Sequence, residues 1–317
     1  MQSLLDKQFL GKASELLPLM QDQTITDILI NGPKSLYIEK SGKLTPLASP
    51  FEEKQPIMDF IERILIPIGK RVDAANPYVD GRLLDGSRFN VLMPPIAVNG
   101  PFISIRKNRS YSNVRLDMFS EQELVGWLET WVKERKNILI AGGTGAGKTT
   151  LLSCLIDLIS EDERIALIEE TKEIFVRHPH IVSLEARSAS PEGKGEVSLR
   201  TLVKNALRMR PDRIILGECR GQEAFDMVQA MNTGHAGSMG TIHSNGALDG
   251  LKRLETLVLL AGFDVPIKAV RQWVSSCVDV VVFIERTPLG RKVKEVITVQ
   301  GMEGEVYRIS PRYSLKK

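Results

Sequence analysis

Short apolar runs separated by turn residues dominate the first third of the chain. Residues 26–30 and 35–39 flank Asn31-Gly32-Pro33, which predicts a hairpin, and Ser41-Gly42 turns the chain into a further short strand. Asp85-Gly86 lies between two more such runs, residues 82–84 and 87–93. An Asp-Gly pair between hydrophobic runs is a strong hairpin signal, so we predict a second hairpin there.

Helical periodicity appears at two places in the same region. Leucines recur among the polar residues 1–20, and five apolar residues fall on one face of residues 52–66. A strand over 102–106 completes the pattern. We therefore predict a small α+β domain over residues 1–108, followed by a polar interdomain linker over residues 109–120.

The rest of the chain, residues 121–317, alternates between strand and helix patterns. A helix is predicted near 124–132, where Trp127 and Trp131 belong to a core stripe, and others near 198–208, 246–260 and 266–276. Strands are predicted at 137–141, 164–169, 181–184, 213–216, 238–242, 278–284 and 293–299. Such alternation predicts an α/β domain with a mostly parallel sheet covered on both faces.

A phosphate-binding loop follows the first of these strands. Residues 142–149 match G-x-x-x-x-G-K-[ST] at every defined position: Gly142, Gly143, Thr144, Gly145, Ala146, Gly147, Lys148 and Thr149, with Thr150 next. The glycines let backbone N–H groups surround phosphates, and a helix N-terminus adds its positive dipole end. Lys148 would reach the β- and γ-phosphates and Thr149 would hold Mg²⁺. The sequence therefore predicts that this chain binds a nucleoside triphosphate, with ATP and Mg²⁺ as the expected cofactors.

A carboxylate ends the strand that begins at Arg213. Glu218 follows Gly217, where an ordinary Walker B motif has an aspartate. Residues at the carboxyl ends of parallel strands lie beside the ligand in open α/β sheets. We predict that Glu218 orients the attacking water, or contacts the metal through water.

Two further polar groups are candidates for the same site. The acidic run from Glu169 to Glu173 follows another strand, so Glu170 or Glu173 could serve Mg²⁺ and water, although such a run is also typical of a solvated loop. His235 and His243 flank one short strand without the Cys or Asp spacing that zinc needs. We consider them γ-phosphate sensors, with a backbone-satisfied turn histidine as the alternative.

Composition limits the remaining possibilities. The 42 Lys and Arg exceed the 39 Asp and Glu by 3, which is too small a surplus to argue for a nucleic-acid partner. No apolar run approaches the roughly 18 residues of a membrane span, and the N-terminus lacks a signal-peptide pattern. Cys154, Cys219 and Cys277 are far apart and sit in apolar stretches, which is typical of buried, reduced thiols. We predict a cytoplasmic protein.

With these stretches identified, the chain resembles the secretion ATPases of type II and type IV secretion systems, and most of all the Tad/Flp pilus assembly (CpaF-like) branch. The resemblance covers nearly the whole chain. It rests on residues 28–33, 80–90 and 103–107 in the first domain, and on residues 142–149, 168–173, 211–220 and 234–245 in the second.

The resemblance implies a RecA-like motor domain, an N-terminal domain over the nucleotide, and a hexameric ring at the inner membrane, attached through platform proteins. It implies an acidic box at Glu169–Glu173 and a histidine box at Gly234–His243. It also raises Arg88 and Arg106, with Arg82 behind them, as arginines that reach the phosphates; from the sequence alone they are ordinary surface arginines.

Two departures from the family are visible. The acidic box reads Glu169-Glu170 where relatives usually have Glu-Asp. The sequence also begins almost directly at the nucleotide-covering domain, so we do not expect membrane recruitment through the longer N-terminal extensions of many relatives. We predict a hexameric ATP hydrolase that powers pilus assembly or protein secretion. A nucleic-acid-translocating ATPase and a nucleotide-gated scaffold with little turnover are the alternatives.

Overall fold

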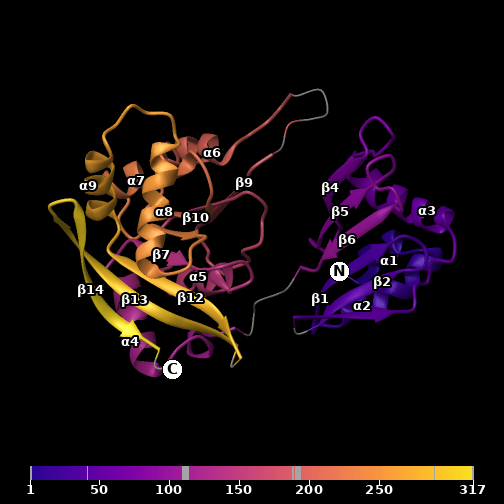
Figure 1. The fold of residues 1–317 in the computed structure, drawn as a ribbon, viewed down its shortest axis with the longest axis horizontal. Helices are drawn as coiled ribbons and strands as arrows, with labels where there is room; N and C mark the ends of the chain where they lie inside the picture. The colour runs from indigo at the N-terminus through magenta and orange to yellow at the C-terminus, as the bar shows by residue number, and fades with distance from the viewer. Residues whose placement is uncertain are drawn as a thin grey trace. The chain divides into compact units, whose positions relative to one another are not determined.

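The computed structural model describes residues 2–40, 42–108, 114–187, 189, 194–288 and 290–315. The chain forms two compact units, Met1–Ser110 (unit 1) and Tyr111–Lys317 (unit 2) (Figure 1). The hydrophobic cores of the two units share no residues, so each unit is described by itself.

Unit 1 is built on a six-stranded antiparallel sheet in the order β3-β2-β1-β6-β5-β4. The strands are β1 (Ile25–Asn31), β2 (Leu36–Lys40), β3 (Lys43–Leu47), β4 (Tyr78–Arg82), β5 (Arg88–Leu92) and β6 (Phe102–Arg106). Both predicted hairpins are confirmed, because β1 pairs with β2 and β4 pairs with β5. The strand predicted after Ser41-Gly42 is β3.

The helices of unit 1 pack on one face of this sheet. The core between them includes the buried residues Ile28, Phe60 and Ile105. They are α1 (Gln2–Gln8), η1 (Gly11–Leu16), α2 (Leu17–Gln21), α3 (Lys54–Leu65) and η2 (Ile66–Ile68). The prediction of one helix over 1–20 is wrong. Gly11 adopts φ +62°, a conformation that an α-helix cannot contain, and Pro18 lies in the first turn of a new helix, where its missing N–H costs nothing.

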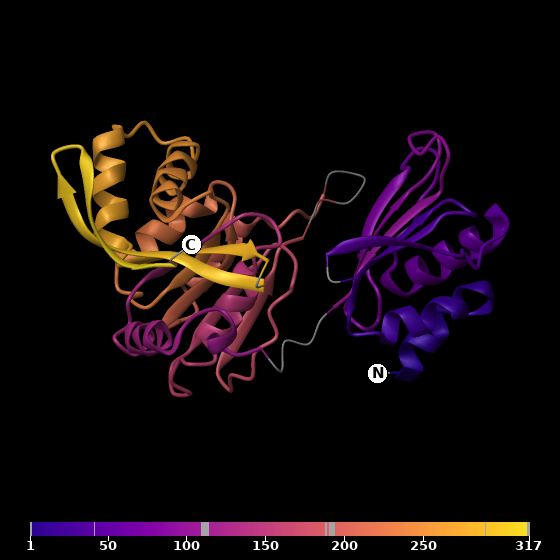
Figure 2. The same cartoon turned by 60° about the horizontal axis from the view of Figure 1, so that its bottom comes forward.

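Unit 2 contains an eight-stranded sheet in the order β14-β13-β12-β7-β11-β10-β8-β9. Its strands are β7 (Ile138–Ala141), β8 (Ile165–Glu169), β9 (Ile181–Glu185), β10 (Arg213–Cys219), β11 (Met239–Ile242), β12 (Val280–Thr287), β13 (Gly290–Glu303) and β14 (Val306–Ser314). The run from β12 to β9 is parallel, which confirms the predicted α/β fold. Figure 2 shows β13 and β14 as the long yellow hairpin that extends this sheet.

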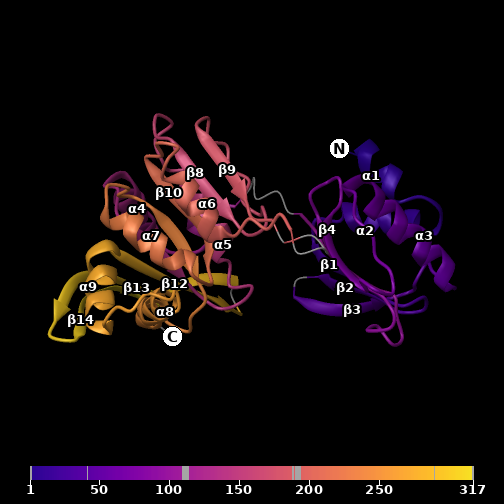
Figure 3. The same ribbon diagram turned by 90° about the horizontal axis from the view of Figure 1, so that it is seen from above.

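Alternate residues of the central strands face two separate cores. Ile138 and Ile140 pack with α4 (Gln122–Lys133), α5 (Lys148–Ile156) and η3 (Leu116–Met118). Leu139 and Ala141 pack with α6 (Leu199–Ala206), α7 (Glu223–Asn232), α8 (Ala247–Leu259) and α9 (Ile267–Cys277). Figure 3 labels these four helices beside the strands of unit 2. A strand buried on both faces must be apolar throughout, which explains the continuous run of residues 138–141.

The predicted linker, residues 109–120, is described by the structure only in part. Residues 109–113 lie outside the described residues. Leu116 and Phe119 are buried in the core around α4 and α5, so residues 116–119 belong to unit 2. Cys154, Cys219 and Cys277 are free and buried, as predicted. Within the described ranges, no helix is long and apolar enough to cross a membrane.

Candidate active site

The phosphate-binding loop connects the carboxyl end of β7 to the N-terminus of α5. Gly145 and Gly147 adopt φ values of +70° and +101°, where a side chain would be strained. The Ala146 N–H donates to Gly143 O at 3.3 Å, which closes a turn within the loop. Lys148, Thr149 and Thr150 form the first turn of α5. The sequence therefore builds a strand, a left-handed glycine turn and a helix N-terminus in the order that a phosphate site requires.

Lys148 is buried beneath the loop. Its Nζ donates to Gly142 O at 3.0 Å and to Gly143 O at 3.1 Å, and it lies 3.4 Å from His243 Nε2. Burial lowers the pKa of the Lys148 ammonium, the charge of Arg220 lowers it further, and Glu218 opposes both. The Lys148 ammonium thus lies at the carboxyl end of β7, close to His243, Glu218 and Arg220 at the carboxyl ends of neighbouring strands.

Glu218 lies at a bulge in β10. The pairing of β10 with β11 passes from Leu216–Gly240 to Cys219–Ile242, so three residues of β10 cover two of β11. The Thr241 hydroxyl donates to Gly217 O at 2.6 Å and fixes this irregular segment. The sequence predicts a strand over residues 213–216, whereas the strand continues through the bulge to Cys219. Bulges next to active sites re-aim side chains, and here the bulge surrounds the expected catalytic carboxylate.

Arg220 joins two carboxylates from different strands. Its Nε and Nη2 lie 2.8 and 2.6 Å from Oε2 of Glu218, and its Nη1 donates to Oε2 of Glu170 at 2.6 Å. Burial opposes the charge of the guanidinium, but the bond and the charge of Glu218 outweigh it and raise the Arg220 pKa. We did not single out Arg220 from the sequence. Its position two residues after Glu218 was the available signal, because such residues face the same side of a strand.

His243 follows β11 and lies between Lys148 and Glu218. Its Nε2 is 2.5 Å from Oε1 of Glu218. This Oε1 is buried and has no partner with hydrogen-bond geometry among the described residues, so the contact with His243 is a close approach of the two side chains. Burial lowers the pKa of the His243 imidazole, Lys148 and Arg220 lower it further, and Glu218 partly opposes them. The neutral imidazole is therefore favoured at neutral pH.

His235 is not brought to this cluster within the chain. It precedes β11 at the amino end of that strand, where its carbonyl accepts from Ser238 Oγ at 2.7 Å. The N–H of Ser238 is bound by Asn137, which lies at the start of β7. Since β7 and β11 are parallel, His235 lies at the opposite sheet edge from the phosphate-binding loop. His235 and His243 flank the same strand, so the length of β11 separates them.

The acidic box divides into a structural and an exposed part. Glu169 is buried, and its Oε1 accepts from the backbone N–H of Glu173 at 2.8 Å and of Ile174 at 3.0 Å. It therefore shapes the loop that follows β8. Of the two alternatives left open by the sequence, Glu170 has the ion pair with Arg220, while the charge of Glu173 also raises the Arg220 pKa.

The three candidate arginines of unit 1 form a row across neighbouring strands. Arg82 of β4 is paired with Arg88 of β5, and Arg88 with Arg106 of β6. Arg106 is paired in turn with Asp27 of β1, and its Nε lies 3.2 Å from Oδ1 of that residue. Directly opposite residues point to the same face of a sheet. The row therefore places three guanidinium groups on one face of the sheet.

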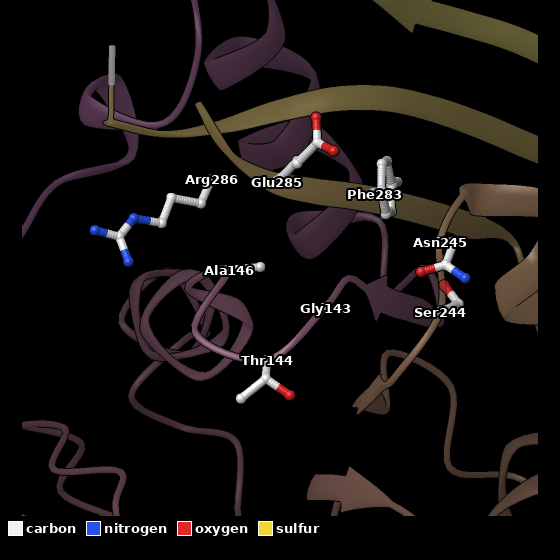
Figure 4. Close-up of a pocket in the computed structure, with 8 residues that line it drawn as sticks. All are labelled: Gly143, Thr144, Ala146, Ser244, Asn245, Phe283, Glu285 and Arg286. Atoms are coloured by element: carbon white, nitrogen blue, oxygen red, sulfur yellow. The ribbon is translucent and has the colours of Figure 1, made fainter. Parts of the chain in front are cut away.

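A pocket borders the phosphate-binding loop on the side of β12. It is lined by Gly143, Thr144 and Ala146 of the loop, by Ser244 and Asn245, and by Phe283, Glu285 and Arg286 (Figure 4). Figure 4 shows the β12 side chains and the Ser244–Asn245 segment around the loop ribbon. The pocket offers one aromatic face and several polar groups next to the loop.

The residues present fit a nucleotide with a metal ion. The left-handed glycine turn at a helix N-terminus suits phosphate, and Thr149 offers a hydroxyl in the first turn of α5. The buried Oε1 of Glu218, without a hydrogen-bond partner in the described part of the chain, is an acceptor suited to water or a hydrated cation. Among the described residues, no cluster of three or more His, Cys, Asp or Glu could hold a metal alone.

Comparison with known proteins places this geometry in a family. Residues 11–295 match the family described as type II/IV secretion system protein. A putative conjugal transfer protein of Mycobacterium tuberculosis is 35% identical over 309 residues, which cover 94% of this chain and 87% of that protein. The type IV secretion system protein VirB11 of Bartonella quintana is 30% identical, with 90% of this chain and 92% of that protein covered.

Solved structures agree with this assignment. The VirB11 ATPase of Brucella suis aligns with a TM-score of 0.50 and 26% identity, covering 93% of this chain and 96% of that chain. The Legionella pneumophila ATPase DotB aligns with a TM-score of 0.67 at 20% identity, covering 90% and 80% of the two chains, which supports the fold alone. The family match spans both units and includes the whole cluster around Glu218. The chain therefore belongs to the type II/IV secretion system protein family, and it is an ATPase of that family.

Proposed function

We propose that this chain is a motor that hydrolyses ATP to power pilus assembly or protein secretion, and that it acts as a hexameric ring. One observation carries the hydrolytic part of the proposal. Glu218 lies at the strand end next to the phosphate-binding loop, with one oxygen bound by Arg220 and the other beside His243. A carboxylate held in this way suits the positioning of an attacking water.

The residues of the loop would bind the nucleotide. Backbone N–H groups and Lys148 would hold the phosphates, Thr149 would hold Mg²⁺, and the pocket beside β12 suits the nucleoside. When bound, ATP supplies the phosphoanhydride bond and Mg²⁺ neutralises its charge. Arg220 keeps Glu218 Oε2 occupied, so Oε1 is the oxygen that accepts a proton from water.

His243 and the acidic box would report the state of the site. His243 contacts both Lys148 and Glu218, so it responds to a change at either residue. Glu170 is coupled to Glu218 through Arg220, which favours Glu170 over Glu173 as the working acid of the box. We assign no role in the same chain's site to His235, because it lies at the other end of β11.

The arginines of unit 1 would complete the site. Arg88 and Arg106, with Arg82 beside them, form a cationic row on one sheet face, and such a row suits the charge that develops on a transferred phosphoryl group. A ring would let one chain provide this row to its own or a neighbouring site. Rotation of the two units about the segment between them would then transmit the movement.

We further propose that the motor lies in the cytoplasm and acts on inner-membrane platform proteins. The relatives named above are a conjugal transfer protein and a type IV secretion protein, which supports a role in moving macromolecules across the envelope. Within this family we favour the Tad/Flp branch, on residues 28–33, 80–90 and 103–107 of unit 1. The formal net charge of +3 gives no support to nucleic acid as a direct partner.

Phosphate release measured against protein concentration, with size-exclusion light scattering alongside, tests the proposal. We expect the specific activity of the wild type to rise as hexamers form. Glu218→Gln should lower kcat by a factor of about 10²–10⁴, the usual contribution of a general base, while ADP binding persists. Glu161→Gln, which removes an exposed carboxylate of the same unit, is the matched control and should leave kcat unchanged.

Three outcomes would contradict the proposal. Equal activity in a monomer would exclude the ring mechanism. Full activity of Glu218→Gln would exclude the assigned role of the carboxylate. Stimulation by DNA that disappears with rising salt would favour a nucleic-acid-translocating ATPase instead.

A further inference from the structure

The hairpin of β12 and β13 lies against the phosphate-binding loop. Arg291, the second residue of β13, is paired with Arg286 of β12. The Nε of Arg291 donates to Gly145 O at 3.0 Å. This bond joins the terminal part of the sheet to a loop that lies 146 residues earlier in the sequence.

A second contact places the same side chain on the next glycine of the loop. A Cβ added to Gly147 would lie 2.7 Å from Cδ of Arg291 and 3.5 Å from its Cβ and Cγ. The aliphatic part of Arg291 therefore covers Gly147, whose φ of +101° already disfavours a side chain. At the other end of the loop, a Cβ on Gly142 would lie 2.5 Å from Ile284 O of β12. The hairpin thus touches three glycines of the loop.

The bond from Arg291 determines the orientation of the peptide group between Gly145 and Ala146. In a trans peptide the C=O and the following N–H point in opposite directions. When Gly145 O points toward Arg291, the N–H of Ala146 points the other way, toward Gly143 O across the turn. Glycine-rich backbone changes conformation at little steric cost, so this orientation needs an external partner to be held.

We propose that Arg291 is a positioning residue for nucleotide binding, which fixes the phosphate-binding loop through Gly145 and Gly147. This inference rests on the proposed function, because it concerns the same ATP site. Arg291 lowers the entropy that the loop loses when it surrounds phosphates, and such preorganisation increases affinity. Because a contact that orders the loop stabilises the bound ground state and the transition state alike, loss of Arg291 should weaken binding and leave the rate of chemistry nearly unchanged.

The test compares Arg291→Ala and Arg291→Lys with a matched control, Arg308→Ala. Arg308 is an exposed arginine of β14, and its Nη2 donates to Gln300 O at 3.0 Å, so it too makes one bond to a backbone carbonyl of this sheet. In the full-length protein, we would measure the Kd for ADP by competition with a fluorescent nucleotide, and kcat and KM for ATP. The melting temperature without nucleotide would be recorded for every variant.

We expect Arg291→Ala to raise the Kd for ADP and the KM for ATP by about tenfold, in the range of one lost charged hydrogen bond. The value of kcat at saturation should stay within about twofold of the wild type. Arg291→Lys should recover part of the affinity, because it keeps a donor and an aliphatic stem. Arg308→Ala should bind and hydrolyse like the wild type.

Other results would overturn the inference. These are an unchanged Kd in Arg291→Ala, an equal loss of affinity in Arg308→Ala, or a fall in kcat with no change in Kd. If Arg291→Ala melts at a markedly lower temperature, the comparison rests on Arg291→Lys. A raised Kd for ADP in Arg291→Lys, at the melting temperature of the wild type, supports the inference. A Kd equal to that of the wild type overturns it. A wild type that binds no nucleotide would instead contradict the proposed function.

Discussion

Arg220 binds Glu218 through a single oxygen. Both Nε and Nη2 of the guanidinium reach Oε2, at 2.8 and 2.6 Å, and the remaining Nη1 reaches Glu170. The fork of an arginine can hold two carboxylates at fixed positions, and a lysine cannot. The orientation of Glu218 is therefore set jointly by β10 and by the acidic loop after β8.

Replacing Arg220 should impair the chemical step more than binding. We expect Arg220→Lys to lower kcat by about tenfold with little change in KM, because the Glu218 carboxylate keeps a cation nearby but loses its fixed orientation. Steady-state phosphate release gives both constants. Arg135→Lys is a suitable control, since Arg135 also pairs with a carboxylate of unit 2 but lies away from this cluster. A raised KM with unchanged kcat would show that Arg220 serves binding instead.

The pH dependence of kcat should reveal His243. Its pKa is lowered, so the imidazole is neutral above the ordinary value of about 6.5 and becomes protonated only below it. A charged imidazole 2.5 Å from Glu218 would compete for the carboxylate. We expect an acid limb of kcat below about pH 6.5 in the wild type and its loss in His243→Asn. His180→Asn, which changes an exposed histidine of unit 2, should keep the limb. Identical limbs in both variants would exclude His243 as its source.

Breaking the ion pair of Arg213 and Glu163 from one side should destabilise unit 2. Arg213 is 1% exposed, and its Nη2 and Nε donate to the two oxygens of Glu163 at 2.6 and 2.8 Å. Breaking such a pair from one side leaves a buried charge uncompensated. We expect Glu163→Gln to lower the free energy of unfolding by about 3–5 kcal/mol. Glu161→Gln, two residues away and exposed, should change it by less than about 0.5 kcal/mol.

The same pair has a defined pH dependence. Burial opposes the charged form of Glu163, but its bond to Arg213 outweighs burial and lowers the pKa. A lowered carboxyl pKa gives stability that is present above the ordinary value, about 4.5, and is lost as the pH falls through the folded value. Denaturant unfolding followed from pH 7 down to about pH 3 should therefore show a smaller decline in Glu163→Gln than in the wild type, with the difference confined to pH values below about 4.5. Parallel curves would contradict this assignment.

Replacing an arginine of the row in unit 1 should lower kcat without changing the melting temperature. Arg106 is 66% exposed, so its pair with Asp27 contributes little to stability. We expect Arg106→Ala to lower kcat by at least about tenfold, given the contribution of arginines to phosphoryl transfer. The melting temperature should change little, because an exposed ion pair contributes little to stability. Lys40→Ala removes a comparable exposed pair, with Asp22, and should affect neither quantity. A fall in both quantities would indicate a structural arginine.

The fold was largely predictable because its signals are local. The Asp85-Gly86 turn, the apolar run of residues 138–141 and the glycine loop each specify their structure within a few residues. The break at Gly11 was missed because an amphipathic pattern continues across it, and neither β14 nor α7 was foreseen. Glu218 and the loop residues belong to motifs, whereas the bond of Arg220 to Glu170 and the bond of Arg291 to Gly145 join segments that are far apart in the sequence. His235 was included because it belongs to the histidine box of the family resemblance, Gly234–His243, although a residue that precedes a parallel strand lies at the amino end of the sheet.

The sheet of unit 1 separates opposite charges on one of its faces. Along one register of its sheet, Glu39 and Asp27 lie at one side and Arg106, Arg88 and Arg82 at the other, all on the same face. Such a separation of opposite charges gives the face a lateral electric dipole. A polyanion diffusing toward this face would be guided to the β4–β6 side and deflected from the β1–β2 side, at a rate that falls with ionic strength.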